Sequence, residues 1–508
     1  MEGTGEHSNH QGEKEGLLRP QDEAPATGLA RLAGALGRPG WFVVLHTLGY
    51  AALVWVHNAG IPWFEQSPEA VRAVFAREHS LGRTLAQAAV LAYLFVLYGL
   101  TWRYWRIIRP RVSWLVRTGA LIAVVAAAGV ALNSVDIFAY VAFGRLAAVH
   151  GLNPYTHLYQ EVHDSYAPFA WFHAPMPYGP LVLPFFMPAG VAAGVNAWLG
   201  VYVLKATWVL VHGGAGYLLY QILRHRGDDP ARGLFLFLFN PLLVLELLVN
   251  GHNDGLMILC ILGAIRALQT ERTGWALVLA LASTLIKLPG LLFLAAVGVL
   301  ALRGRRWRAI AAAGMVGIAV VVTLQQTLIP GLDVAINLTN PHGQLNQHSI
   351  HRVIFQWLLR FGWFDPGMLH PTGWLRTGLT ALFAGFCLWR AARVRTLEDV
   401  VQETVYMTLA LLAGYSMRFW PWYLTWLLPF ASLTASRTIR ETLLLYSATS
   451  VLLYAVPHPL LAKRLGWQTL HHLFVHGIPL ARLAAGILGN RGGPRNRPDD
   501  GHARSQQT

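Results

Sequence analysis

Residues 121–133 read LIAVVAAAGVALN, an apolar run that ends just before the first acidic side chain of the region, Asp136. Similar runs recur along most of the chain, for example AVVVTLQQTLIP at 319–330. Only 13% of the 508 residues are charged, whereas soluble globular proteins carry about 25%. This shortage of charge indicates that lipid, rather than water, is the solvent for most of the chain, and it predicts an all-α polytopic membrane protein.

Segments long enough to cross a bilayer alone, or as short tilted pairs, are predicted to give about 14 transmembrane helices. They lie near 41–59, 84–102, 117–134, 200–223, 233–250, 254–268, 274–287, 288–302, 309–328, 373–392, 401–417, 422–435, 441–456 and 467–488. No long polar linker interrupts 41–488, which predicts a single membrane domain. Residues 1–40 and 489–508 are polar and are predicted to be disordered cytoplasmic tails.

The formal net charge of +15 comes from arginines in short blocks between apolar segments, which is the positive-inside pattern of membrane proteins rather than a nucleic-acid-binding surface. The blocks fall at 103–117, 224–226, 303–308, 390–395 and 437–440. They predict that both termini are cytoplasmic and that two long segments, near 135–199 and 329–372, are extracytoplasmic. The apolar stretch 181–196 fits this orientation only as a re-entrant or interfacial segment. Long ordered outer loops are usually functional.

The first outer segment opens with NSVDIFAYVAFGRLAAVHGLNPY at 133–155. Asp136 follows the third predicted span, where a carboxylate can act at the membrane surface. In a helix, Tyr140 would share its face and Arg145 would point away from it. Asn153 precedes Pro154 and is predicted to end this helix. We interpret Asp136 as a functional carboxylate at the membrane surface; the alternative is that it caps an interfacial helix.

A second polar patch lies in FNPLLVLELLVNGHNDG at 239–255. Glu246 falls inside an apolar span, where an ionisable residue is a functional candidate. His252, Asn253 and Asp254 cluster at the outer end of that span. The alternative is a tight polar turn between two short helices. No metal site is predicted, because a hard metal ion usually needs more carboxylates than this patch supplies.

Two lysines are candidates for binding a phosphate. Lys287 falls at the apex of a short helical hairpin whose ends are cytoplasmic, and Lys205 falls in the outer third of the fourth span. An ammonium is a suitable point charge for an anionic lipid head group. The alternative for both is that the side chain snorkels to the membrane interface.

Further cationic donors come from the second outer segment and from a late outer turn. His348, His351 and Arg352 lie in NPHGQLNQHSIHR, and Arg418 opens the aromatic sequence MRFWPWYLTW at 417–426. Zinc binding is not favoured, because no cysteine or carboxylate joins the histidines. Donation to a phosphate or sugar is the preferred interpretation. The aromatic side chains either form a membrane-interface belt or stack on a sugar ring or a lipid chain.

In order, these patches resemble the GT-C superfamily and, within it, the bacterial polyprenyl-phosphate-mannose-dependent mannosyltransferases. The matching residues are Asp136-Ile-Phe-Ala-Tyr140, Gly144-Arg145, Gly151-Leu-Asn-Pro-Tyr155, Tyr178-Gly-Pro180, Asn240-Pro241, Glu246, Asn250-Gly-His-Asn-Asp254, Lys287-Leu-Pro289 and Trp420-Pro-Trp-Tyr423. The resemblance covers nearly all of 41–488. One departure is that many relatives carry two adjacent acidic residues where this chain has Asp136 alone.

The resemblance implies a plasma-membrane glycosyltransferase that moves a hexose from a polyprenyl-phosphate sugar to an acceptor glycan or glycolipid on the extracytoplasmic face. Mannose is the hexose that the resemblance favours. Asp136 would be the general base, and no cofactor or metal is implied. Lys287, Lys205, His348, His351, Arg352 and Arg418 would bind the donor phosphate. The sugar and the acceptor would contact Tyr140, Arg145, Asn153, Tyr155, Tyr178, Glu246, His252, Asn253 and Asp254.

The chemistry can also be argued from the residues. A sugar on a polyprenyl phosphate already carries a good leaving group, so one base and a few cationic donors suffice, and attack from the opposite face inverts the anomeric centre. Three other classes stay open. They are a secondary transporter, a ligase that moves a polyprenyl-diphosphate glycan, and a non-catalytic membrane scaffold.

Overall fold

The computed structural model describes residues 38–61, 80–170, 174–329, 348–363, 373–455 and 472–492, together with Gly28, Gly34 and Gly331. Within these ranges all regular secondary structure is helical, which confirms the all-α class. Most of the two predicted tails lies outside the described residues, as does most of the predicted outer segment 329–372.

Within the described residues, every predicted span overlaps with helix, although the third one, 117–134, is helical only as far as Ala127. The helices are α2 (Pro39–Asn58), α4 (Leu81–Arg103), α6 (Val112–Ala127), α9 (Ala197–Arg226), α10 (Pro230–Leu238) with α11 (Pro241–Val244), α12 (Asp254–Gln269), α13 (Thr273–Ile286), α14 (Gly290–Arg303), α15 (Trp307–Thr327), α18 (Trp374–Ala391), α19 (Leu397–Ala410), α20 (Leu428–Leu433), α21 (Arg437–Ser450) with α22 (Leu452–Ala455), and α25 (Ile478–Gly492). Among the described residues, three helices are individually long and apolar enough to cross a membrane, or up to four if one bent pair counts as a span. The count of about 14 is therefore not confirmed.

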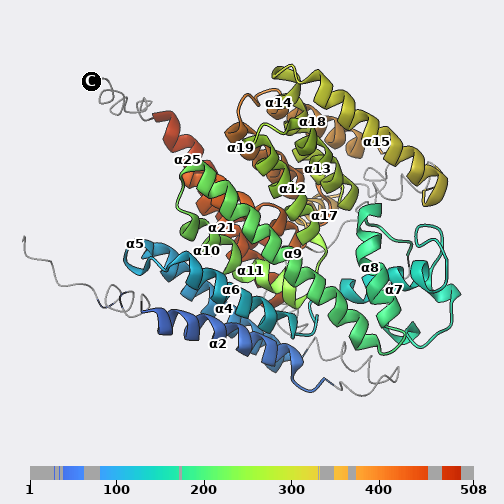
Figure 1. Ribbon diagram of the computed structural model, residues 1–508. Helices are drawn as coiled ribbons and strands as arrows, with labels where there is room; N and C mark the ends of the chain where they lie inside the picture. Colours follow the sequence, from blue (N-terminus) through green and yellow to red (C-terminus); the bar gives the residue numbers. More distant parts are fainter. Residues whose placement is uncertain are drawn as a thin grey trace, which may run out of the picture.

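Helix α9 is the central element of the arrangement (Figure 1). This helix of 30 residues packs against α8 (Leu183–Ala192), α10 and α12. Helices α2, α4 and α6 form one group of neighbours, and α12 to α15 form another. The long central helix thus joins the first and middle parts of the chain into one body.

The segment 230–249 is a broken helix. Pro241 cannot donate the backbone hydrogen bond that would continue α10, and Asn240 caps the new helix by accepting from the amides of Leu242 and Leu243 at 3.0 and 3.2 Å. The two parts meet at a bend of 50°. A π-helical turn, η5 (Leu245–Val249), follows α11. Such turns are rare and occur frequently at functional sites.

Helices α7 (Asp136–Ala148) and α8 cross at glycines. A Cβ atom on Gly144 would lie 2.0 Å from the carbonyl oxygen of Phe186, and one on Gly190 would lie 2.2 Å from the amide nitrogen of Arg145. The glycines therefore allow backbone-to-backbone contact. Helix α8 has 10 residues and is too short to span a bilayer alone, in agreement with the interpretation of 181–196 as something other than a full span.

Helix α7 ends earlier than predicted. Its last residue is Ala148, not the residue before Pro154, because the chain reverses at Gly151, which has a φ of +63°. The amide of Leu152 returns to the carbonyl of Leu146 at 2.9 Å. This reversal is the usual helix-ending use of a glycine in the left-handed conformation.

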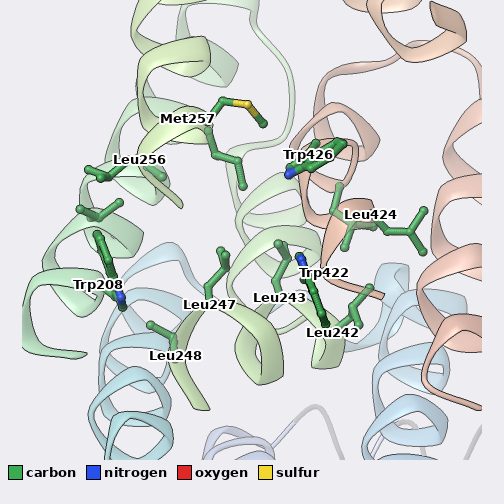
Figure 2. Packing of buried hydrophobic residues seen from close by; sticks show 14 of the residues in the cluster. Trp208, Leu242, Leu243, Leu247, Leu248, Leu256, Met257, Trp422, Leu424 and Trp426 are labelled. Atoms are coloured by element: carbon green, nitrogen blue, oxygen red, sulfur yellow. The ribbon is translucent and has the colours of Figure 1, made fainter. Parts of the chain in front are cut away.

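Large apolar side chains fill the space between α9, α12, the α11–η5 segment and the 3-10 turn η8 (Pro421–Trp426). Figure 2 shows this core, with Trp208 on α9 and Trp422 and Trp426 on η8. It supports the turns that carry the polar residues described next.

Candidate active site

Asp136 is the first residue of α7, and its carboxylate is held by two tyrosines. Tyr178 donates to Oδ2 at 3.0 Å and Tyr140 donates to the same oxygen at 3.5 Å. The predicted shared helical face of Asp136 and Tyr140 is therefore confirmed. Val135 occupies the capping position, where no side chain caps the helix, and Ser134 accepts from the amide of Asp136 at 3.2 Å. The cap interpretation of Asp136 is not supported.

His252 lies between two carboxylates. Its Nδ1 is 3.5 Å from Asp136 Oδ2, and its Nε2 is 3.4 Å from Glu246 Oε2. Neither contact has hydrogen-bond geometry, so both are electrostatic pairs. The side chains of His252 and Glu246 are fully buried, whereas that of Asp136 is 21% exposed. The imidazole thus joins a buried carboxylate to one that reaches the surface of the site.

The buried Glu246 is fully engaged by neighbours. Tyr454 donates to Oε1 at 2.6 Å and Asn250 donates to Oε2 at 2.9 Å. Gly251, with a φ of +73°, reverses the chain after η5, and the amide of His252 donates to the carbonyl of Glu246 at 2.9 Å. The π turn and this reversal together bring His252 back over Glu246.

Lys287 and Asp254 form a buried ion pair. The Lys287 ammonium lies 2.8 Å from both oxygens of Asp254, and the indole of Trp426 also donates to Asp254. Lys287 terminates α13 at the turn before α14, as its predicted place at a hairpin apex requires. Its ammonium is 5.4 Å from the ring centre of Tyr178, so the cation and Asp136 share one tyrosine.

Tyr178 is positioned by close contact with the end of α13. Gly179 donates to the carbonyl of Ile286 at 3.1 Å, and a Cβ atom on Gly179 would lie 2.0 Å from the carbonyl oxygen of Leu285. Tyr155 donates to the carbonyl of Tyr178 at 2.8 Å. The first outer segment is therefore seated directly on the turn that carries Lys287.

A row of stacked rings leads from His252 to the second outer segment. Trp422 stacks on His252 with 4.3 Å between ring centres, and Trp420 stacks on Trp422 at 4.9 Å. His348 contacts Trp420 edge-on at 4.7 Å. The aromatic residues of MRFWPWYLTW thus include some that pack inside the site, beside the two acidic patches.

Arg145 and Asn153 organise the first outer segment away from Asp136. Arg145 pairs with Asp164 at 2.5 Å, and His150 and Tyr159 contact the same carboxylate. Partial burial alone would raise the pKa of Asp164, but these contacts lower it to about 2. Asn153 donates to the carbonyl of Leu328 at 2.8 Å. Neither side chain contacts Asp136 or Lys287 among the described residues.

The remaining predicted residues have other surroundings. Lys205 donates to the carbonyls of Gly129, Leu248 and Val249, and its side chain is buried. The ring of His351 contacts the carbonyl of Gly414 at 3.2 Å. The backbone of Arg418 contacts the hydroxyl of Ser416, which donates to its carbonyl and accepts from its amide. The side chain of Arg352 is not among those that the structure describes. Phosphate binding by these residues stays a prediction.

Asn253 is buried, and both polar atoms of its amide lack hydrogen-bond partners within the described part of the chain. In the same ranges, no group of three or more His, Cys, Asp or Glu side chains is arranged to hold a metal ion. The polar groups that the described residues bring together here are carboxylates, one imidazole, one ammonium, tyrosine hydroxyls, two asparagine amides and the Trp426 indole.

The sequence did not predict that Tyr454 contacts Glu246 or that Trp426 contacts Asp254. Tyr454 lies 208 residues from Glu246 in the sequence, and Trp426 lies 172 residues from Asp254. A tyrosine or tryptophan near the end of an apolar helix usually indicates the membrane interface. No local signal distinguishes these two from such residues.

This helical fold, with acidic and cationic residues gathered at the ends of apolar helices, is that of a membrane protein. The comparisons specify the family. A family model described as alpha-(1->6)-mannopyranosyltransferase, N-terminal domain, matches residues 43–303. Because this range exceeds half of the chain, the protein belongs to that family. The resemblance to bacterial mannosyltransferases of the GT-C superfamily is confirmed.

Two similar proteins come from Corynebacterium glutamicum. Alpha-(1->6)-mannopyranosyltransferase A is 27% identical over 164 residues, which are 30% of this chain and 32% of that protein. Alpha-(1->6)-mannopyranosyltransferase B is 27% identical over 221 residues, 38% of this chain and 36% of that protein. The chain thus matches about a third of the length of each relative. No solved structure gives a significant match.

Proposed function

We propose that the protein is an inverting α-mannosyltransferase that takes mannose from a polyprenyl monophosphate carrier and transfers it to a glycan or glycolipid on the extracytoplasmic face. The observation that carries the proposal is the partly exposed carboxylate of Asp136 beside the Lys287–Asp254 pair. The family membership and the names of the relatives support the choice of mannose.

Asp136 has one oxygen available for a substrate. The contacts of Tyr178, Tyr140 and His252 all fall on Oδ2, and within the described residues no hydrogen bond reaches Oδ1. As general base, Oδ1 takes the proton of the acceptor hydroxyl while the acceptor oxygen bonds to the anomeric carbon. The bond from that carbon to the phosphate oxygen breaks, and its electron pair leaves with the phosphate. Attack opposite the leaving group inverts the configuration.

Lys287 is the best-placed cation for the departing phosphate. Two of its three ammonium protons suffice for the two oxygens of Asp254, which leaves one for a phosphate oxygen. Its side chain retains 10% exposure although its partner Asp254 is fully buried. A cation fixed before the reaction can stabilise the charge that develops on the leaving group. No metal is needed in this scheme.

The substitution Asp136→Asn tests the proposal. The amide keeps the shape of the side chain but cannot accept the acceptor's proton, and general base catalysis contributes roughly 10²–10⁴-fold. We expect transfer from radiolabelled polyprenyl-phosphate mannose, measured in proteoliposomes, to fall by that order. Binding of the donor lipid should persist.

Thr156→Ser is the matched control, because Thr156 is an exposed residue of the same outer segment that does not contact the carboxylate. It should retain wild-type transfer. Wild-type rates in Asp136→Asn would contradict the role of the base. Transfer only from polyprenyl-diphosphate donors would favour the ligase instead, and uptake that depends on an ion gradient without sugar transfer would favour the transporter.

A further inference from the structure

We propose that His252 is a positively charged positioning residue, held between the buried carboxylate of Glu246 and the catalytic carboxylate of Asp136, and that this line of three groups keeps Asp136 ionised and directs Oδ1 toward the acceptor. The inference rests on the function proposed above. It assigns Glu246 and His252 to the base itself, in place of direct contact with the sugar.

The first argument is the burial of the imidazole. The His252 side chain has no exposed surface, and Trp422 covers one face of its ring at 4.3 Å between ring centres. A group so enclosed has no room to contact a sugar, but both ring nitrogens lie within 3.5 Å of a carboxylate oxygen. Its environment is therefore that of an ion held in place by opposite charges.

The second argument concerns the far end of the line. A buried carboxylate is costly unless it is paired and hydrogen-bonded. Glu246 receives hydrogen bonds from Tyr454 and Asn250, and His252 supplies the opposite charge. These contacts fix Glu246 on three sides, so Glu246 in turn fixes the position of the imidazole.

The third argument concerns the surroundings of Asp136. Ionisable and polar groups from five elements lie near it. They are Tyr140 of α7, Tyr178 of the first outer segment, Asp254 of α12, Lys287 of the α13–α14 turn and Tyr423 of η8. Burial alone would raise the pKa of Asp136. The contacts with His252, Lys287 and Tyr178, of which His252 contributes most, together outweigh this effect, and the pKa is lowered.

The pKa of His252 shifts in the opposite sense. Burial alone would lower it, but Asp136 and Glu246 together raise it, so the imidazole stays protonated through neutral pH.

The charge of His252 determines in which direction the pH dependence of activity changes when the imidazole is removed. The base is active only when Asp136 is ionised, so activity falls as the pH drops through its pKa. Loss of the imidazolium should raise that pKa and move the fall in activity to higher pH.

Infrared titration of the purified protein tests the charge interaction among Glu246, His252 and Asp136 without any need for sugar transfer. The protonated carboxyl band of Asp136 is identified by its loss in Asp136→Asn. In His252→Gln we expect this band to appear at a pH about 1–3 units higher than in the wild type, the range expected for loss of a nearby opposite charge. An unchanged midpoint would overturn the proposal.

Glu246→Gln provides an independent variant that keeps the shape of the buried side chain. The ring band of His252, assigned by its loss in His252→Gln, should show deprotonation at a lower pH in Glu246→Gln, because one of the two opposite charges is gone. Retention of the wild-type midpoint would show that Glu246 does not hold the charge of His252, and a neutral His252 at pH 7 in the wild type would overturn the proposal outright.

The matched control is His212→Gln. His212 is also buried, but it stacks on Phe237 at 4.9 Å and lies outside the site. The His212→Gln variant should leave the carboxyl band of Asp136 and the ring band of His252 unchanged.

Transfer kinetics add a second readout. The acid limb of kcat/KM should move to higher pH in His252→Gln, whereas a merely structural role would lower the rate equally at every pH. Absence of transfer in the wild type would refute the proposed function, while the infrared result would still decide the present inference.

Discussion

Under the proposed function, Lys287 would both neutralise Asp254 and bind the departing phosphate. Its ammonium is already bound to Asp254 through both carboxylate oxygens, yet its position near Tyr178 suits an approaching phosphate. A substitution that removes the lysine alone would leave the fully buried Asp254 without its opposite charge. Breaking such a pair on one side typically costs about 3–5 kcal/mol, so a loss of activity could reflect a loss of folding.

The double variant Lys287→Met/Asp254→Asn separates the two effects. Both charges disappear, and the amide can still accept the hydrogen bond from Trp426. We expect Lys287→Met to have a lower thermal midpoint in detergent, and the double variant to recover most of it. Turnover should remain strongly reduced in both. A double variant with wild-type turnover and wild-type KM for the donor would show that Lys287 serves only to neutralise Asp254.

Local patterns predicted some of these residues well. A spacing of four in a helix suffices to place Tyr140 against Asp136, and the apex position of Lys287 follows from two short apolar segments. The partners of these groups were not predictable in the same way. Tyr454 reaches Glu246, and Lys205 donates to backbone carbonyls, because tertiary packing, which leaves no periodic trace in the sequence, decides both contacts.

At the scale of elements, the crossing of α7 and α8 sets the position of Asp136. Tyr140 stacks on Phe186 of α8 with 4.7 Å between ring centres and 5° between ring planes, and Gly144 lets the two backbones touch about one turn further along. The sequence predicted α7 as a helix but not where it ends. Its length depends on the reversal at Gly151, whose positive φ is a property of the folded chain.

Gly144→Ala tests this crossing. The added methyl would overlap the carbonyl of Phe186, so α7 and α8 must separate, at a cost of about 1–3 kcal/mol for overpacking. We expect a lower thermal midpoint in detergent and reduced transfer, because Asp136 and Tyr140 move with α7.

Gly99→Ala is the matched control, since Gly99 lies inside α4 with nothing within 4 Å of the added methyl. Alanine there should leave the midpoint unchanged or raise it, because alanine favours a helix by about 1 kcal/mol over glycine. Equal behaviour of the two variants would mean that the crossing tolerates separation.

For the whole molecule, the site draws on both halves of the chain. The matched family region, 43–303, contains Asp136, His252 and Lys287. Trp422 and Tyr454 come from beyond it and complete the contacts of His252 and Glu246. The arginine blocks predicted the orientation of the chain, but which later helix returns to the site depends on packing between distant segments.

Cysteine labelling from outside the cell tests that orientation. Cys260 and Cys387 are first replaced by alanine, and single cysteines are then introduced at Thr156, Trp363 and Gly304, all of which are exposed. The arginine pattern predicts that a membrane-impermeant maleimide modifies the first two positions, and the third only after permeabilisation. Protection of Thr156 and Trp363 in intact cells would reverse the orientation and remove the outer-face site.

The buried ammonium of Lys205 has a consequence for how the protein is made. Its carbonyl partners at Leu248 and Val249 are synthesised 43 and 44 residues after it, whereas Gly129 is made 76 residues before it. In the predicted topology, α9 therefore enters the bilayer while only one of three partners exists. A lysine at the centre of an inserting helix costs about 2.5–3.5 kcal/mol, and one in its outer third, such as Lys205, costs less. In that topology we therefore expect the insertion of α9 to become fully favourable only after the ribosome has delivered the broken helix that carries Glu246, so that the site would form late in translation.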